Sequence, residues 1–170
     1  MVRGLRFDEL NTEAKERARD AYRCELNDAL DRAVLIVIGD RMKAEGIGSL
    51  EDINFSLNEC EGDGIAFYGE LDIDEFLKAI GLTRDTIKNP LGKDAYVTIV
   101  PERDTIYHNK DTMVIRSGGC SLDFLVVVRD RLMRIIKELE IECYEIMNNE
   151  DKVLRELVDC CEFDENGKEI

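Results

Sequence analysis

Apolar residues recur every three or four positions over the first 48 residues, which is the spacing of a buried helix face. Residues 7–30 contain Asn11, a residue type that caps helix N-termini, just before this pattern begins. Residues 31–48 continue the pattern and contain Gly46 and Gly48, either of which is a suitable helix stop. We expect a helix in the first range, and a second helix or an extension of the first in the other.

Apolar and polar residues alternate in the middle of the chain, which is the period of half-buried β-strands. The first two strands are joined by the sequence EGDG at residues 61–64, and a short helix capped by Asp72 or Asp74 follows. Five segments have strand character: 51–59, 64–73, 95–100, 104–109 and 112–116.

Helical spacing returns near the C-terminus. A long apolar stripe runs from Ser121, a suitable N-cap, to Leu139, and a further helix is expected to begin at Asn149. The run Val126–Val128 has strand propensity and weakens the helical pattern locally. The chain therefore predicts one α+β domain over residues 1–170, an antiparallel sheet of about five short strands packed against N-terminal and C-terminal helices.

Composition is that of a globular protein, with 36% charged and 44% hydrophobic residues in 170. No apolar run approaches the roughly 20 residues of a membrane span, and the N-terminus has no secretory h-region, so we expect a cytoplasmic protein. The six cysteines include no C-x₂₋₄-C pair, and the compartment is reducing. We expect no disulfide, no metal and no cofactor.

The net charge of −15 argues against direct binding to nucleic-acid phosphates or to an anionic membrane. It permits docking onto a basic surface, including one that normally holds nucleic acid.

Much of this charge falls in one stretch. No lysine or arginine occurs between Lys43 and Lys78, and nine acidic residues lie between Glu51 and Glu75, a net of −9. In a hairpin these acids would sit within about one Debye length, roughly 8–10 Å. We interpret part of the stretch as a partner-binding patch: Glu59, Glu61, Asp63, Glu70, Asp72, Asp74 and Glu75.

Other ligands fit this stretch less well. The EF-hand pattern fails because Cys60 stands where an Asp or Asn ligand is needed, and neither the P-loop nor the G-x-G-x-x-G pattern is present. A metal-dependent hydrolase could use Asp72, Asp74 and Glu75, but the dipole at a helix N-terminus explains the same acids.

One enzyme alternative remains open. Cys120 precedes a helix, where a thiol can become an activated thiolate, and His108 is the only histidine that could serve it as a base.

Four stretches together resemble a family of small phage and prophage proteins, some of which carry an antitoxin label. They are FDELNTEAKERAR (7–19), INFSLNECEGDGIAFYGEL (53–71), TIYHNKDTM (105–113) and CEFDENGKEI (161–170). The chain departs from that pattern at Glu61, where glutamine is common. No catalytic residue is implied by the resemblance, which indicates a phage-borne accessory protein.

Charge and resemblance together lead to one hypothesis: a phage-encoded acidic inhibitor that binds a basic surface of a host protein or ribonucleoprotein, of the anti-CRISPR or anti-restriction type. The first alternative is an antitoxin that neutralises a toxin by direct contact. The second is a small enzyme or ligand-binding protein that uses Cys120 and His108. The apolar helices are also compatible with a homodimer.

Overall fold

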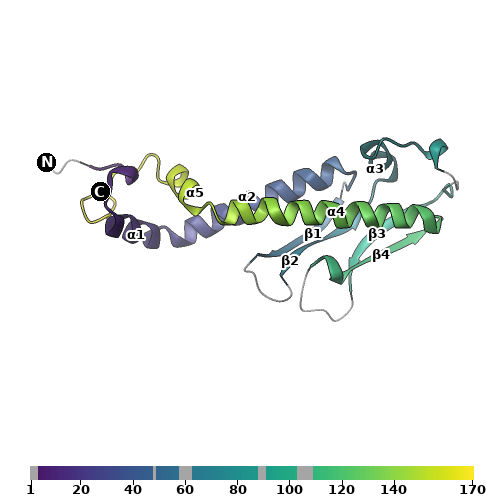
Figure 1. The fold of residues 1–170 in the computed structure, drawn as a ribbon, viewed down its shortest axis with the longest axis horizontal. Helices are drawn as coiled ribbons and strands as arrows, with labels where there is room; N and C mark the ends of the chain where they lie inside the picture. Colours follow the sequence, from purple (N-terminus) through teal and green to yellow (C-terminus); the bar gives the residue numbers. More distant parts are fainter. Residues whose placement is uncertain (1–3, 48, 58–62, 88–90, 103–108) are drawn as a thin grey trace. The chain divides into compact units, whose positions relative to one another are not determined.

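The computed structural model describes residues 4–47, 49–57, 63–87, 91–102 and 109–170, and Figure 1 shows their secondary structure. The chain divides into two compact units. The first comprises residues 1–34 and 145–170, and the second comprises residues 35–144. The two boundaries fall inside the helices α2 (Arg23–Ala44) and α4 (Leu122–Met147), so these helices are shared between the units.

The first unit begins with a 3₁₀ turn, η1 (Phe7–Glu9), and α1 (Thr12–Ala21). Asn11 caps α1 as expected, because its side chain accepts a hydrogen bond from the backbone N–H of Ala14 at 2.9 Å. The helix pattern breaks at Tyr22, earlier than the boundary near residue 30 that the periodicity predicts.

Tyr22, at this break, contacts the C-terminal segment. Its hydroxyl donates to the Glu169 carboxylate and lies 3.4 Å from the Cys161 sulfur. Burial, together with these two contacts, raises the pKa of Tyr22 well above its ordinary value. Local periodicity cannot report a contact with the far end of the chain.

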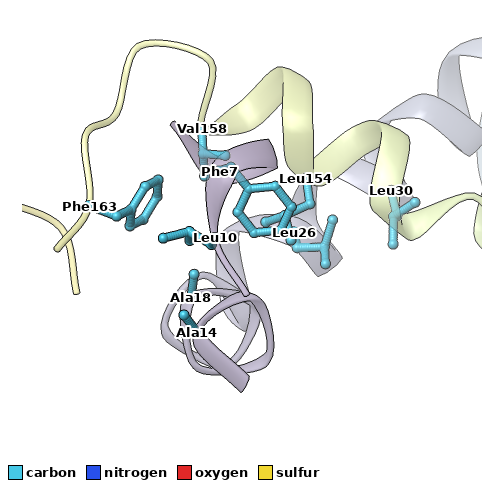
Figure 2. Close-up of a cluster of buried hydrophobic side chains, with 9 residues drawn as sticks. All are labelled: Phe7, Leu10, Ala14, Ala18, Leu26, Leu30, Leu154, Val158 and Phe163. Carbon is cyan, nitrogen blue, oxygen red and sulfur yellow. The ribbon is translucent and has the colours of Figure 1, made fainter. Parts of the chain in front are cut away.

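The core of the first unit is a cluster of apolar side chains from both ends of the sequence (Figure 2). The rings of Phe7 and Phe163 meet edge to face with centroids 6.3 Å apart. Leu5 and Phe163 exchange two backbone hydrogen bonds of 2.9 Å, and α5 (Glu150–Leu157) contributes Leu154. The cluster comprises Phe7, Leu10, Ala14, Ala18, Leu26, Leu30, Leu154, Val158 and Phe163.

The second unit contains an antiparallel sheet in the order β1-β2-β3-β4. The strands are β1 (Ser49–Ser56), β2 (Gly64–Glu70), β3 (Tyr96–Pro101) and β4 (Met113–Gly118). The α+β class is confirmed, with four strands in the described residues rather than about five. The strand expected over residues 104–109 falls almost entirely outside those residues, and Asn109 instead caps the 3₁₀ turn η3 (Lys110–Thr112).

The sheet consists of two hairpins that are joined at one end (Figure 1). Strand β2 pairs with β3 only where Gly69 lies opposite Ile99 and Glu70 lies opposite Thr98. Further along β2, the backbone N–H of Phe67 donates to the sulfur of Met113 at 3.4 Å. Met113 therefore lies where the two hairpins diverge.

Helices α3 (Ile73–Ala79) and α4 complete the second unit, with the 3₁₀ turn η2 (Arg84–Thr86) after α3. Ser121 caps α4 through a 3.3 Å hydrogen bond from the N–H of Phe124, as the sequence predicts. Despite their strand propensity, Val126–Val128 are helical, and Val128 is fully buried. The Phe124 ring meets Phe76 of α3 edge to face at 6.2 Å.

The C-terminus of α2 connects both of these helices. Glu45 is buried and accepts two hydrogen bonds from the Arg131 guanidinium of α4, at 2.7 and 2.8 Å. Gly46, at φ +80°, ends α2, and the N–H of Ile47 donates to the carbonyl of Met42, which is the Schellman arrangement. The Gly46 carbonyl then accepts a 2.7 Å hydrogen bond from Asp72, the first residue before α3.

Replacing Gly46 with alanine is expected to destabilise the protein by about 2 kcal/mol or more, because φ is positive and the new Cβ would lie 2.4 Å from the Phe76 nitrogen. Gly39→Ala is the matched control. Apart from its chain neighbours and the backbone of its own helix, no described atom lies within 4 Å of a Cβ built on Gly39. This substitution is therefore expected to stabilise α2 by about 0.5–1 kcal/mol. Urea unfolding measures both, and a stabilised Gly46→Ala would contradict this account of the helix end.

Removing the Arg131 side chain as Arg131→Leu is expected to cost about 2 kcal/mol, because the Glu45 carboxylate, only 6% exposed, loses its bidentate partner and keeps only Arg41, whose Nε lies 3.6 Å from it. Arg134→Leu, an exposed arginine on the same helix, is expected to change stability by less than about 0.5 kcal/mol. The double variant Glu45→Leu/Arg131→Leu should recover much of the loss. Equal losses in the free energy of unfolding for Arg131→Leu and Arg134→Leu, measured in urea, would contradict the role given to Glu45.

Candidate partner-binding carboxylates

The first group of candidate acids falls between β1 and β2 in the sequence, and Asp63 is the member that the structure describes. Asp63 is half-buried just before β2, and its carboxylate accepts a 2.5 Å hydrogen bond from the Ser56 hydroxyl at the end of β1. Two other predicted site residues, Glu59 and Glu61, lie outside the described residues.

Gly64 brings a further carboxylate to this end of the hairpin. It begins β2 at φ +149°, a backbone conformation that favours glycine. A Cβ at this position would lie 3.0 Å from the Cβ of Asn109 and 3.0 Å from a carboxylate oxygen of Glu140. The hairpin end therefore packs against the side chain of Glu140 on α4.

The sequence offered one overlooked signal for Glu140. Residues 138–169 contain twelve acidic and three basic residues, a net of −9 that equals the net charge of residues 51–75. The negative charge is thus concentrated in two stretches rather than one. Glu140 belongs to the second stretch and Asp63 to the first, so one acid of each stretch lies at the hairpin end.

The second group of candidate acids surrounds the N-terminus of α3. Asp72 caps the helix, accepting hydrogen bonds from the N–H groups of Asp74 at 3.0 Å and Glu75 at 3.1 Å. This bears out the capping explanation for these acids. The other two residues pair with cations, Asp74 with Arg84 at 2.6 Å and Glu75 with Lys78 at 3.2 Å.

Glu70 is exposed at the end of β2 and belongs to this second group. Strand β2 separates it from Asp63 by about 23 Å, at roughly 3.3 Å per residue. That distance exceeds two Debye lengths at physiological salt, about 8 Å each. The expectation of one continuous patch is therefore wrong for the described residues, because an extended strand keeps its two ends apart.

The two groups also differ in how far helix stability explains them. Acids in the first turn of α3 are favoured by the helix dipole. Helix α4 has acids at the opposite end: Glu142 and Glu145 lie near its C-terminus, and its last turn contains no basic residue. Acids there oppose the dipole by about 0.3–1 kcal/mol each, so the stability of α4 does not account for them.

Cys120 does not have the environment of an activated nucleophile. It is half-buried, and its Sγ–H donates to the carbonyl oxygens of Tyr96 and Gly118, both at 3.5 Å. Burial raises the pKa of the Cys120 thiol above its ordinary value, and the nearby charge of Arg84 offsets only part of this effect. The other residue of the enzyme hypothesis, His108, lies outside the described residues.

Within the described ranges, no group of three or more His, Cys, Asp or Glu side chains has a metal-binding arrangement. Likewise, none of the helices found there has the length and apolar character needed to cross a bilayer.

Cys120 is expected to react with iodoacetamide several-fold more slowly at pH 8 than the exposed Cys24 and Cys160, because burial disfavours its thiolate. Cys143, whose burial raises its thiol pKa to about 11, should react slowest of the four. Peptide mass spectrometry over a pH series gives each rate. If Cys120 reacts faster than Cys24, and its rate reaches half of its maximum below pH 8, the alternative of an enzyme that uses Cys120 would be favoured.

Comparison with protein-family models, with curated proteins and with solved structures found no match to this chain. The resemblance of the four sequence stretches to a phage protein family stays a prediction.

Proposed function

We propose that this protein is an inhibitor that binds a basic surface of a partner macromolecule, with the carboxylates at the β1–β2 hairpin end as its principal contact. The observation that supports this most is the contact between Gly64 and Glu140. It places one carboxylate of α4 beside the stretch 51–75, whose net charge is −9.

Bringing like charges together has an electrostatic cost that a folded chain normally offsets with a cation. Among the described side chains, no lysine or arginine forms an ion pair with Glu140. A basic partner would supply the missing positive charge, and its affinity would gain from relieving that repulsion.

The acids near α3 have a smaller part in this proposal. Asp72 already serves the backbone of α3, and Asp74 and Glu75 already have the cations Arg84 and Lys78. These ion pairs are exposed, and exposed pairs are worth only about 0–1 kcal/mol, so a strongly basic partner could exchange them. We assign this group to the edge of the interface.

The class of partner follows from charge and from the resemblance to phage proteins. Basic surfaces large enough to attract a protein of net charge −15 are typical of proteins that hold nucleic acid. A phage-borne protein that occupies such a surface would block a host nucleic-acid-handling or defence complex, of the anti-CRISPR or anti-restriction type. Inhibition would be steric and electrostatic competition with the nucleic acid.

The test is capture of proteins from host lysate on immobilised wild type and on two neutralised variants. The hairpin variant is Glu59→Gln/Glu61→Gln/Asp63→Asn/Glu140→Gln. The control removes the same charge from exposed positions on α1 and α2: Glu16→Gln, Glu25→Gln, Asp28→Asn and Asp31→Asn. We expect nucleic-acid-binding proteins on the wild type and on the control, eluted by added duplex DNA or RNA, and at least tenfold less on the hairpin variant.

Two outcomes would contradict the proposal. The first is equal capture by the hairpin variant and the control, which would mean that overall charge alone drives binding. The second is a captured partner that nucleic acid does not displace. A third variant measures how much the acids near α3 contribute to capture: Glu70→Gln/Asp74→Asn/Glu75→Gln. It is expected to weaken capture less than the hairpin variant does.

A further inference from the structure

A hollow of about 330 Å³ lies in the second unit between α4, the turn η3 and the strands β3 and β4. Its apolar wall is formed by side chains from both the helix and the sheet: Ile99, Met113, Ile115, Leu132 and Met133. The volume is at the lower end of the range for small-molecule sites, about 300–1,000 Å³. Two of the wall residues are methionines, whose flexible side chains adapt to an apolar occupant.

The rim of the hollow is basic, although the protein as a whole is strongly acidic. Lys110 and Arg129 line it together with one acid, Asp111. The Asp111 side chain is 78% exposed and lies 3.8 Å from the Lys110 nitrogen, so solvent screens this pair. No carboxylate among the described residues forms an ion pair with Arg129.

The charge of the surrounding sequence agrees with the rim. Residues 76–137 contain eleven basic and seven acidic residues, a net of +4 in a chain of net −15. The described residues that line the hollow all belong to this stretch. An anion that approaches the protein is therefore repelled by much of its surface and attracted at this hollow.

We propose that the hollow is a binding site for a small carboxylate with an apolar tail, a ligand separate from the macromolecular partner of the carboxylate groups. The tail occupies the space between Met113, Leu132 and Met133, and the carboxylate faces Lys110 and Arg129. Because a water-sized group takes up about 30 Å³, the hollow holds roughly eleven such groups. Octanoate, with eight carbons and two oxygens, matches that size and supplies the required charge.

The experiment is a titration of isotopically labelled wild type with sodium octanoate, followed by amide NMR shifts. We expect saturable shifts confined to η3, β4 and the part of α4 around Leu132. Octylammonium, which has the same apolar tail and the opposite charge, is expected to bind at least tenfold more weakly. This comparison uses wild-type protein alone, so it does not depend on any variant folding correctly.

Variants then locate the ligand. Lys110→Gln/Arg129→Gln is expected to weaken octanoate binding about tenfold, since charge-assisted hydrogen bonds are lost. Met133→Trp should abolish binding by filling the hollow, whereas Val126→Trp, at an exposed position of the same helix, should leave it unchanged. The NMR spectrum of each variant also reports whether it is folded.

Any of three results would overturn the assignment: no saturable binding of octanoate, equal binding of octanoate and octylammonium, or shifts that persist in a folded Met133→Trp variant. None of these results bears on the macromolecular partner, because capture by the hairpin end is measured without octanoate and through different residues.

Discussion

The buried ion pair between Glu45 and Arg131 is the interaction on which the second unit most depends. It fixes the C-terminus of α2 to the middle of α4, and the adjacent Gly46 fixes the same helix end to the start of α3. A buried carboxylate is stable only when it is paired and hydrogen-bonded. The geometry of this pair therefore determines where α3 and α4 lie, and through them where the surface carboxylates are placed.

Both proposed sites involve helix α4. Helix α4 carries basic residues through its middle, including Arg129, Arg131 and Arg134, and acidic residues from Glu138 onward. Its middle borders the apolar hollow, and its acidic part places Glu140 beside Gly64. A single helix thus presents a site suited to an anion and a surface suited to a cationic partner, and this division of charge keeps the two proposed ligands distinct.

Local rules predicted much of the fold. Asn11, Asp72 and Ser121 cap their helices, and Gly46 ends α2, because each choice depends on backbone groups within a few residues. The contact between Tyr22 and Glu169 was not predictable in this way, since the two residues lie at opposite ends of the chain. Four of the five expected strands are present in the described residues, and the fifth, over residues 104–109, falls almost entirely outside them.

The candidate site was predicted only in part. The acidity of residues 51–75 was visible in the sequence, but its division by β2 into two separated groups is a property of the extended strand. Likewise, the charge of residues 138–169 could be counted beforehand, whereas the meeting of Glu140 with the hairpin end could not, because it is a tertiary contact. The basic charge around the hollow could be counted in residues 76–137, whereas the hollow itself depends on how α4 packs against β3 and β4 and could not be predicted from local patterns.

The central claim is that carboxylates at the hairpin end bind a basic partner by electrostatic attraction. Its most direct measurement is the Kd of wild type and of the hairpin-neutralised variant for the captured partner between 50 and 300 mM salt, a range over which the Debye length falls about 2.4-fold. The account predicts a steep loss of wild-type affinity as salt increases and a clearly shallower dependence for the variant. A wild-type Kd that does not change with salt, or identical slopes for the two proteins, would contradict it.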